Sequence, residues 1–106
     1  MTQTLPLKPT QIVSALGSLP GWVLSGDGAD LCIEKSWGFA HFQAAMAFAN
    51  AVAWIAEQQN HHPELTVTYT RCTVRWHTHD AQGLTAKDFA AAQALEKQLW
   101  CDPTSA

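Results

Sequence analysis

The chain has 106 residues, a length that fits one domain with a hydrophobic core of its own. Apolar residues make up 47% of the sequence and charged residues 14%, a balance typical of a folded protein rather than a disordered one. The formal net charge of −3, with six Lys and Arg, provides no basic surface for nucleic acid or anionic lipid. We therefore expect a single domain over residues 1–106, frayed over residues 1–6, with no nucleic-acid or membrane partner.

The cysteines and the N-terminus indicate a compartment. Cys32, Cys72 and Cys101 are odd in number, widely spaced and without a CxxC pair, which is typical of thiols in a reducing environment. The N-terminus lacks the charged-then-apolar pattern of a signal peptide, and no apolar run of about 18 residues could span a bilayer. We expect a soluble, cytoplasmic protein.

The first half of the chain predicts a short helix, a hairpin and a long helix. Residues 8–16 carry an apolar stripe that begins beside a proline, as helices often do. Two strands are expected at 22–24 and 31–37, joined by a turn rich in Gly and Asp. From residue 39 to about 59, apolar residues recur at steps of three and four, which predicts the longest helix.

This long helix has an unusually broad apolar surface. Phe42 and Met46 begin one stripe, and Phe48, Val52 and Ile55 add a second flank. One sheet would not cover both, so we expect part of the helix to contact another subunit in a homodimer or homotetramer.

The second half predicts two more strands and a last helix. Residues 65–70 and 71–78 alternate apolar and polar side chains, so each predicts a strand with one wet face. The link between them is too short for a crossover, which favours antiparallel pairing. Thr85, followed by Asp88 three residues later, is a good helix start. The apolar face of this helix comprises Phe89, Ala92, Leu95 and Leu99.

The resulting order is helix, two strands, long helix, two strands, helix. It predicts an α+β domain in which a four-stranded antiparallel sheet has three helices packed on one face.

Histidines are the main chemical signal of the sequence, because four of the five lie between residues 61 and 79. Pro63 favours an extended backbone at His62, so the long helix should end near Asn60 and separate the side chains of His61 and His62. The alternative is that neither residue is catalytic: His61 would cap the C-terminus of the helix, and His62 would be a surface residue before the proline.

Adjacent histidines are also potential metal ligands. The sequence has no HExxH, no CxxC and no familiar pattern of two histidines with a carboxylate, so we expect no metal site. It has no GxSxG elbow that would indicate a nucleophilic serine.

A set of five spaced elements resembles the signature of the pterin-4a-carbinolamine dehydratases. The elements are Glu57, His61-His62-Pro63, Tyr69, His79 and Asp88. The similarity extends upstream to Gly21-Trp22 and downstream through residues 83–89, and the family has the same order of helices and strands. The chain departs from the family's usual residues at Leu65, His77 and Ala81, none of which is a signature histidine.

The resemblance implies a hydro-lyase that removes water from 4a-hydroxytetrahydrobiopterin to give quinonoid dihydropterin. The substrate is the product left when an aromatic amino-acid hydroxylase uses its tetrahydropterin cofactor, and no metal or organic cofactor is implied. One group must protonate the C4a hydroxyl and another must take the N5 proton, and imidazole, with an unperturbed pKa of about 6.5, can do either. The resemblance implies these two tasks for His61 and His79, and an assisting role for His62.

The resemblance also implies a group of residues that contact the pterin or orient the histidines. They are Glu57, Asn60, Thr78, Asp80, Asp88 and Trp22. Glu57 lies one helical turn before His61 and is placed to orient it, or it is simply a solvated helix residue. Asp88 fits a capping box as well as an orienting role. For Trp22, a core position is the alternative.

A non-catalytic function is the rival hypothesis. In the family that the chain resembles, animal members double as dimerisation cofactors of a transcription factor, and some relatives assist assembly of a photosynthetic enzyme. A scaffold needs no histidine constellation. Because all the signature histidines are present, we favour an enzyme.

Overall fold

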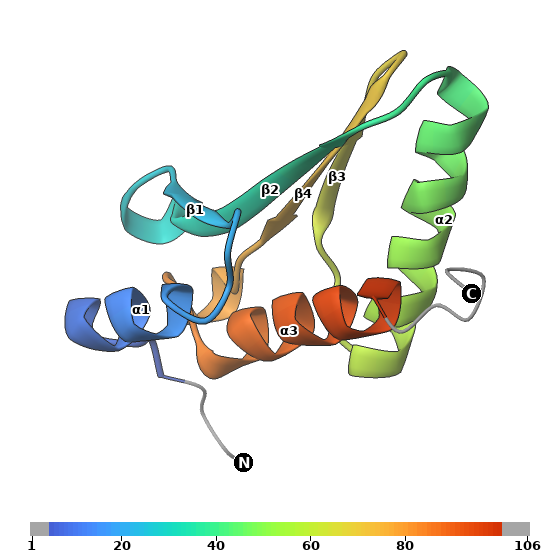
Figure 1. Cartoon of the computed structure of the whole chain (residues 1–106). Coiled ribbons are helices and arrows are strands. Elements are labelled where there is room, and N and C mark those ends of the chain that lie inside the picture. The colour runs from blue at the N-terminus through green and yellow to red at the C-terminus, as the bar shows by residue number, and fades with distance from the viewer. Residues whose placement is uncertain (1–4, 101–106) are drawn as a thin grey trace.

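A four-stranded antiparallel sheet forms one layer of the described structure, and three helices lie together on one side of it (Figure 1). The computed structural model describes residues 5–100, without the side chains of Leu99 and Trp100. The helices are α1 (Pro9–Leu16), α2 (Phe42–Gln59) and α3 (Ala86–Trp100). The strands are β1 (Val23–Ser25), β2 (Cys32–Gly38), β3 (Glu64–Val67) and β4 (Arg71–Trp76). The predicted fold class is confirmed, while the expectations for residues 1–4, Cys101 and the Leu99 side chain lie outside the described part.

Two hairpins combine to form the sheet. The strand order is β1-β2-β4-β3, and all three neighbouring pairs are antiparallel. β2 and β4 therefore join the hairpins at the centre, with a register that runs from Ile33 opposite Trp76 to Gly38 opposite Arg71. Since side chains alternate along a strand, this register sorts them onto an inner face, toward the helices, and an outer face.

The inner face carries the core. Ile33, Val74 and Trp76 have no exposed surface, and they pack with α2 and α3 residues in one hydrophobic cluster. Glu34 and Arg75, which oppose each other on the outer face, form an ion pair with 2.9 Å between Oε1 and Nε. The wet face predicted for β4 is confirmed. None of the helices within residues 5–100 is long and apolar enough to cross a membrane.

Two segments differ most from the sequence expectations, while β1 and β4 lie within two residues of the expected bounds. α2 begins at Phe42 rather than Phe39, because the backbone of His41 is extended and its Nδ1 accepts a hydrogen bond from the first turn of the helix. Phe39 instead follows β2 and donates its N–H, at 2.7 Å, to the carbonyl of Thr70, the residue before β4. β3 stops at Val67, so Tyr69 lies in the turn and is 75% exposed.

The broad apolar surface of α2 is used differently from the prediction. Val52 and Ile55 are buried within the chain, and Phe48 packs on Trp37 with 4.6 Å between ring centroids. The reason is that α2 contacts both the sheet and α3, which together cover a wide face of the helix. The large apolar side chains that α2 exposes are Phe42, Met46 and Trp54.

Candidate active site

The end of α2 directs His61 away from the helix. Asn60 takes the left-handed conformation, with φ of 52° and ψ of 40°, which asparagine tolerates better than most residues. The N–H groups of Asn60 and His61 bond to the carbonyls of Glu57 and Ala56, each at 3.2 Å, and so satisfy the end of the helix. The predicted end of the long helix is confirmed. Because of this left-handed turn, His61 leaves the helical register that would set it above Glu57.

His61 is bonded to a buried carboxylate on α3. Its Nε2 lies 2.7 Å from Oδ1 of Asp88, and the two side chains are 12% and 0% exposed. A buried carboxylate must be satisfied by donors, and the other oxygen of Asp88 accepts from the Thr78 hydroxyl at 2.8 Å and from the Thr85 N–H at 2.9 Å. An ionised carboxylate only accepts hydrogen bonds, so with Asp88 ionised this contact requires a proton on Nε2 of His61. The nitrogen that remains for chemistry is Nδ1.

An aromatic ring fixes the plane of His61 as well. The imidazole stacks on Trp76 of β4, with 5.7 Å between ring centroids and 13° between the planes. The ring is therefore held on one edge by Asp88 and on one face by Trp76. Such preorganisation is what a proton-transfer group needs.

Glu57 is paired with His62 rather than with His61. Its Oε2 lies 2.6 Å from Nε2 of His62, and the two side chains are 70% and 62% exposed. The orienting role expected for Glu57 thus falls on the neighbouring histidine, because the left-handed Asn60 moves His61 toward α3. Both members of this pair are open to solvent, so their mutual attraction is weak.

His79 lies in the loop that follows β4. β4 is followed by a short 3₁₀ helix, His79–Ala81, and an isolated bridge between Thr78 and Gly83 closes this loop. His79 is exposed and makes an edge contact with His77, with 4.5 Å between ring centroids. The second hairpin thereby brings His79 to the end of α2.

A cleft of about 350 Å³, which we call the histidine cleft, collects these groups. It is lined by Asn60, His61, His62, His77, Thr78, His79, Asp80 and Lys87. The structure therefore brings together the three predicted catalytic histidines and the predicted contacts Asn60, Thr78 and Asp80. Asp88 lies behind His61, and Glu57 lies beside His62.

Two lining residues were not predicted. His77 had only its position on the wet face of β4 as a signal, and Lys87 only its place next to Asp88. Among the residues that the structure describes, no three His, Cys, Asp or Glu side chains are arranged to hold a metal ion.

Trp22 is not brought to the cleft. It is 5% exposed, its Nε1 donates to Oε2 of Glu96 at 2.9 Å, and its ring packs edge-on against Trp37. Lys35 bonds to the same Glu96 oxygen at 2.7 Å. Trp22 thus occupies a core position beneath β2, the alternative that its sequence context left open.

The sequence model of the family described as Pterin 4 alpha carbinolamine dehydratase matches residues 5–98. A protein of Paracidovorax citrulli strain AAC00-1, provisionally named pterin-4-alpha-carbinolamine dehydratase, is 48% identical over 93 residues, which are 88% of this chain and 80% of that protein. A protein of Dechloromonas aromatica strain RCB with the same provisional name is 44% identical over 94 residues, 89% of this chain and 80% of that protein.

Solved structures show the same fold. A transcriptional coactivator/pterin dehydratase from Brucella melitensis superposes with a TM-score of 0.76 at 30% identity, covering 87% of this chain and 96% of that one. A second solved structure is that of a pterin dehydratase-like protein identified as a RuBisCO assembly factor in the alpha-carboxysome. It superposes with a TM-score of 0.58 at 18% identity, covering 73% of this chain and 87% of that one. At this identity the similarity shows a common fold and nothing more. The match over residues 5–98 decides the assignment: the chain belongs to the pterin-4-alpha-carbinolamine dehydratase family, whose named activity is that of a hydro-lyase.

Proposed function

We propose that the chain removes water from 4a-hydroxytetrahydrobiopterin and thereby recycles the pterin cofactor of an aromatic amino-acid hydroxylase. In this reaction the C4a–O and N5–H bonds break, the C4a=N5 double bond forms, and quinonoid dihydropterin and water leave. The observation that carries the proposal is the bond between His61 and buried Asp88 beside a cleft that His62 and His79 also line. Family membership supplies the substrate class.

His61 is the proposed base. With Nε2 bonded to Asp88, its Nδ1 is the free ring nitrogen that takes the N5 proton. The Asp88 carboxylate stabilises the positive charge that then forms on the ring, as a carboxylate does for any imidazole that works as a general base. This geometry favours the base role over the acid role for His61, because Nδ1, the ring nitrogen that is not bonded to Asp88, is free to accept a proton.

His79 is the proposed acid. It is exposed, lines the histidine cleft and has no carboxylate bonded to it within residues 5–100, so its ring nitrogens are free to meet the C4a hydroxyl. The proton goes to the C4a hydroxyl, which leaves as water. General acid–base catalysis by positioned side chains typically contributes about 10²–10⁴-fold to a rate. The scheme needs neither a metal nor an organic cofactor.

The remaining polar groups of the cleft are proposed to bind the pterin ring. Asn60 and Asp80 offer an amide and a carboxylate to its polar edge, and His62, held by Glu57, assists from the rim. Thr78 both lines the cleft and bonds to Asp88, so it couples substrate contact to the position of the buried carboxylate. A volume of about 350 Å³ is within the usual range for a small-molecule site.

We also propose a cytoplasmic homodimer or homotetramer. The exposed side chains Phe42, Met46 and Trp54 of α2 are the surface that supports association, since large apolar groups gathered on one helix are commonly covered by a second subunit.

A scaffold without catalysis is the second candidate. It is favoured by the two fold relatives, one of which is described as a transcriptional coactivator/pterin dehydratase and the other as a RuBisCO assembly factor. Equilibrium binding of 7,8-dihydrobiopterin, a stable relative of the product, separates the two functions. The enzyme hypothesis predicts saturable binding that weakens in His61→Ala. A scaffold predicts no histidine-dependent binding.

A further inference from the structure

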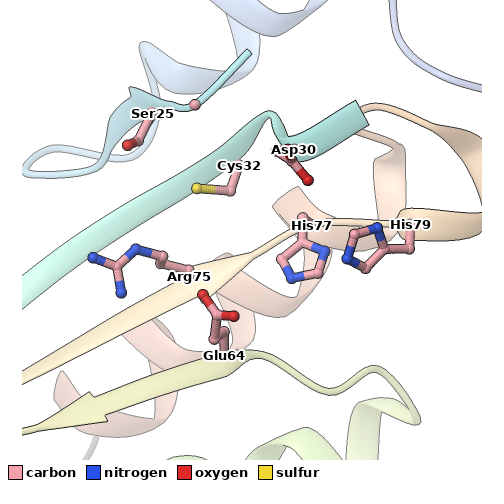
Figure 2. Close-up of a pocket in the computed structure, with 8 residues that line it drawn as sticks. Ser25, Asp30, Cys32, Glu64, Arg75, His77 and His79 are labelled. Carbon is pink, nitrogen blue, oxygen red and sulfur yellow. The ribbon is translucent and has the colours of Figure 1, made fainter. Parts of the chain in front are cut away.

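A second hollow lies on the outer face of the sheet and shares a wall with the histidine cleft. His77 and His79 line both. The rest of the second hollow, which we call the outer hollow, includes Ser25, Asp30 and Glu64. Figure 2 shows Asp30 and Glu64 on opposite sides of His77, with Asp30 coming from the segment before β2 and Glu64 from β3.

The size of the outer hollow suits part of a ligand. Its volume is about 260 Å³, below the roughly 300–1,000 Å³ usual for the site of a whole drug-sized ligand. It borders the histidine cleft, with which it shares the side chains of His77 and His79. A molecule that occupies the cleft and extends past His79 would therefore place a substituent in the outer hollow.

The chemistry of the outer hollow favours hydroxyl groups. Asp30 and Glu64 form no side-chain hydrogen bond or ion pair with any other residue of the 5–100 segment, so both carboxylates are available as acceptors. Nδ1 of His77 is buried and lacks a hydrogen-bond partner within the same segment. A ligand hydroxyl that enters the outer hollow would donate a hydrogen bond to Asp30 or Glu64.

An anionic group would not be favoured there. The cation of the outer hollow, Arg75, already donates from Nε to Glu34 at 2.9 Å and from Nη1 to Thr66 at 3.0 Å. Because Glu34 neutralises the charge of Arg75, the carboxylates of Asp30 and Glu64 would repel an anionic group of a ligand.

We propose that the outer hollow binds the C6 side chain of a pterin held in the histidine cleft, and that Asp30 and Glu64 select a neutral, hydroxylated side chain over an anionic one. C6 is bonded to N5, so its substituent leaves the ring beside the reacting atoms, which the proposed scheme places between His61 and His79. This inference rests on the proposed function and specifies which pterins the site takes.

The test compares three stable 7,8-dihydropterins that carry a methyl, a dihydroxypropyl or a carboxylate-bearing group at C6. Binding is measured by calorimetry for wild type, for Glu64→Gln combined with Asp30→Asn, and for Asp27→Asn. Asp27 belongs to the same loop as Asp30 but does not line the outer hollow. Asp27→Asn removes one negative charge, as Asp30→Asn does, so it is the matched control for the Asp30 half of the double variant.

Wild type and the control are expected to bind the dihydroxypropyl compound roughly tenfold more tightly than the methyl compound, as hydrogen bonds to charged groups allow. In the double variant this preference disappears, the carboxylate-bearing compound gains affinity, and the methyl compound binds as before. If wild type dehydrates the methyl-bearing substrate, but wild type and the double variant each bind all three compounds with equal affinity, this inference is overturned. The proposed function then stands. No binding of any pterin contradicts the proposed function and this inference together.

Discussion

Nε2 of His61 lies 2.7 Å from Oδ1 of Asp88, a carboxylate with no exposed side-chain surface, although 27 positions separate the two residues in the chain. Asp88 belongs to the first turn of α3, where its other oxygen accepts the N–H of Thr85 in the helix cap. The formation of α3 therefore positions the partner of the proposed base. One carboxylate thus serves both the cap of α3 and the proposed catalytic histidine.

Asp88→Asn is expected to reduce kcat by roughly 10²-fold or more, since the neutral amide cannot stabilise the charge that forms on His61. The amide oxygen can still accept from Thr85, so the helix cap is largely kept. Steady-state kinetics and a thermal melt of the same preparation measure the two effects.

Thr85→Ala is the control for the capping role. It removes the hydroxyl that accepts from the Lys87 N–H at 3.2 Å, and we expect a loss of about 1 kcal/mol of unfolding free energy. Because the bond between His61 and Asp88 remains, kcat should fall less than tenfold. If Thr85→Ala lost as much activity as Asp88→Asn, the special role of the carboxylate would be refuted.

Glu57→Gln should have a small effect. The ion pair with His62 is largely exposed, so its removal is expected to change the unfolding free energy by less than about 0.5 kcal/mol and kcat by less than about threefold. Chemical denaturation and kinetics measure both. A loss of activity equal to that of Asp88→Asn would mean that Glu57 acts on the reaction in a way that its position beside His62 does not explain.

The location of the histidines could be predicted from the sequence because local rules determine it. Pro63 restricts the residue before it, which sets the end of α2 near Asn60. The alternation from Cys72 to Trp76 predicts the inner face of β4, and Thr85 with Asp88 predicts the start of α3. Each of these signals lies within a few residues of the feature that it predicts.

The pairing of carboxylates with histidines could not be predicted in the same way. Spacing of four residues suggested Glu57 for His61, but the left-handed Asn60 breaks that helical register. The buried position of the Trp22 side chain likewise depends on its hydrogen bond to Glu96, a residue 74 positions away. Such contacts depend on how α3 packs against the sheet, which no local pattern encodes.

Association through α2 predicts a mass of two or four chains in light scattering. Trp54 is 68% exposed, and Trp54→Glu should shift the mass toward a single chain by placing a charge in an apolar interface. Val13→Glu is a matched control, since Val13 is 71% exposed on α1. A wild-type mass equal to one chain would remove the proposal of a homo-oligomer.

The buried thiols should react slowly. Burial raises the pKa of Cys32, with the charge of Glu34 adding to the effect, and burial also raises the pKa of Cys72. The folded protein therefore favours the protonated thiols. Their contribution to the free energy of unfolding is fully present below pH 9.0, the ordinary thiol pKa. It is lost as the pH rises through the higher pKa values that the thiols have in the folded protein.

A Cys101→Ser background isolates these two thiols. At pH 8 their reaction with a disulfide reagent is expected to be much slower in the folded protein than in denaturant, because the thiolate is the reactive form. Equal rates in the two states would contradict the burial of Cys32 and Cys72.

The most direct test of the account measures dehydration of 4a-hydroxytetrahydrobiopterin, generated in place by an aromatic amino-acid hydroxylase and followed by absorbance. Wild type is compared with a His61→Ala and His79→Ala double variant and with His41→Asn, which alters a histidine outside the histidine cleft and keeps a capping acceptor for α2. Circular dichroism confirms that all three are folded. We predict that wild type and His41→Asn accelerate dehydration above the uncatalysed rate and that the double variant does not. A wild-type rate equal to the uncatalysed rate, or a double variant as active as wild type, would contradict histidine acid–base catalysis in this cleft.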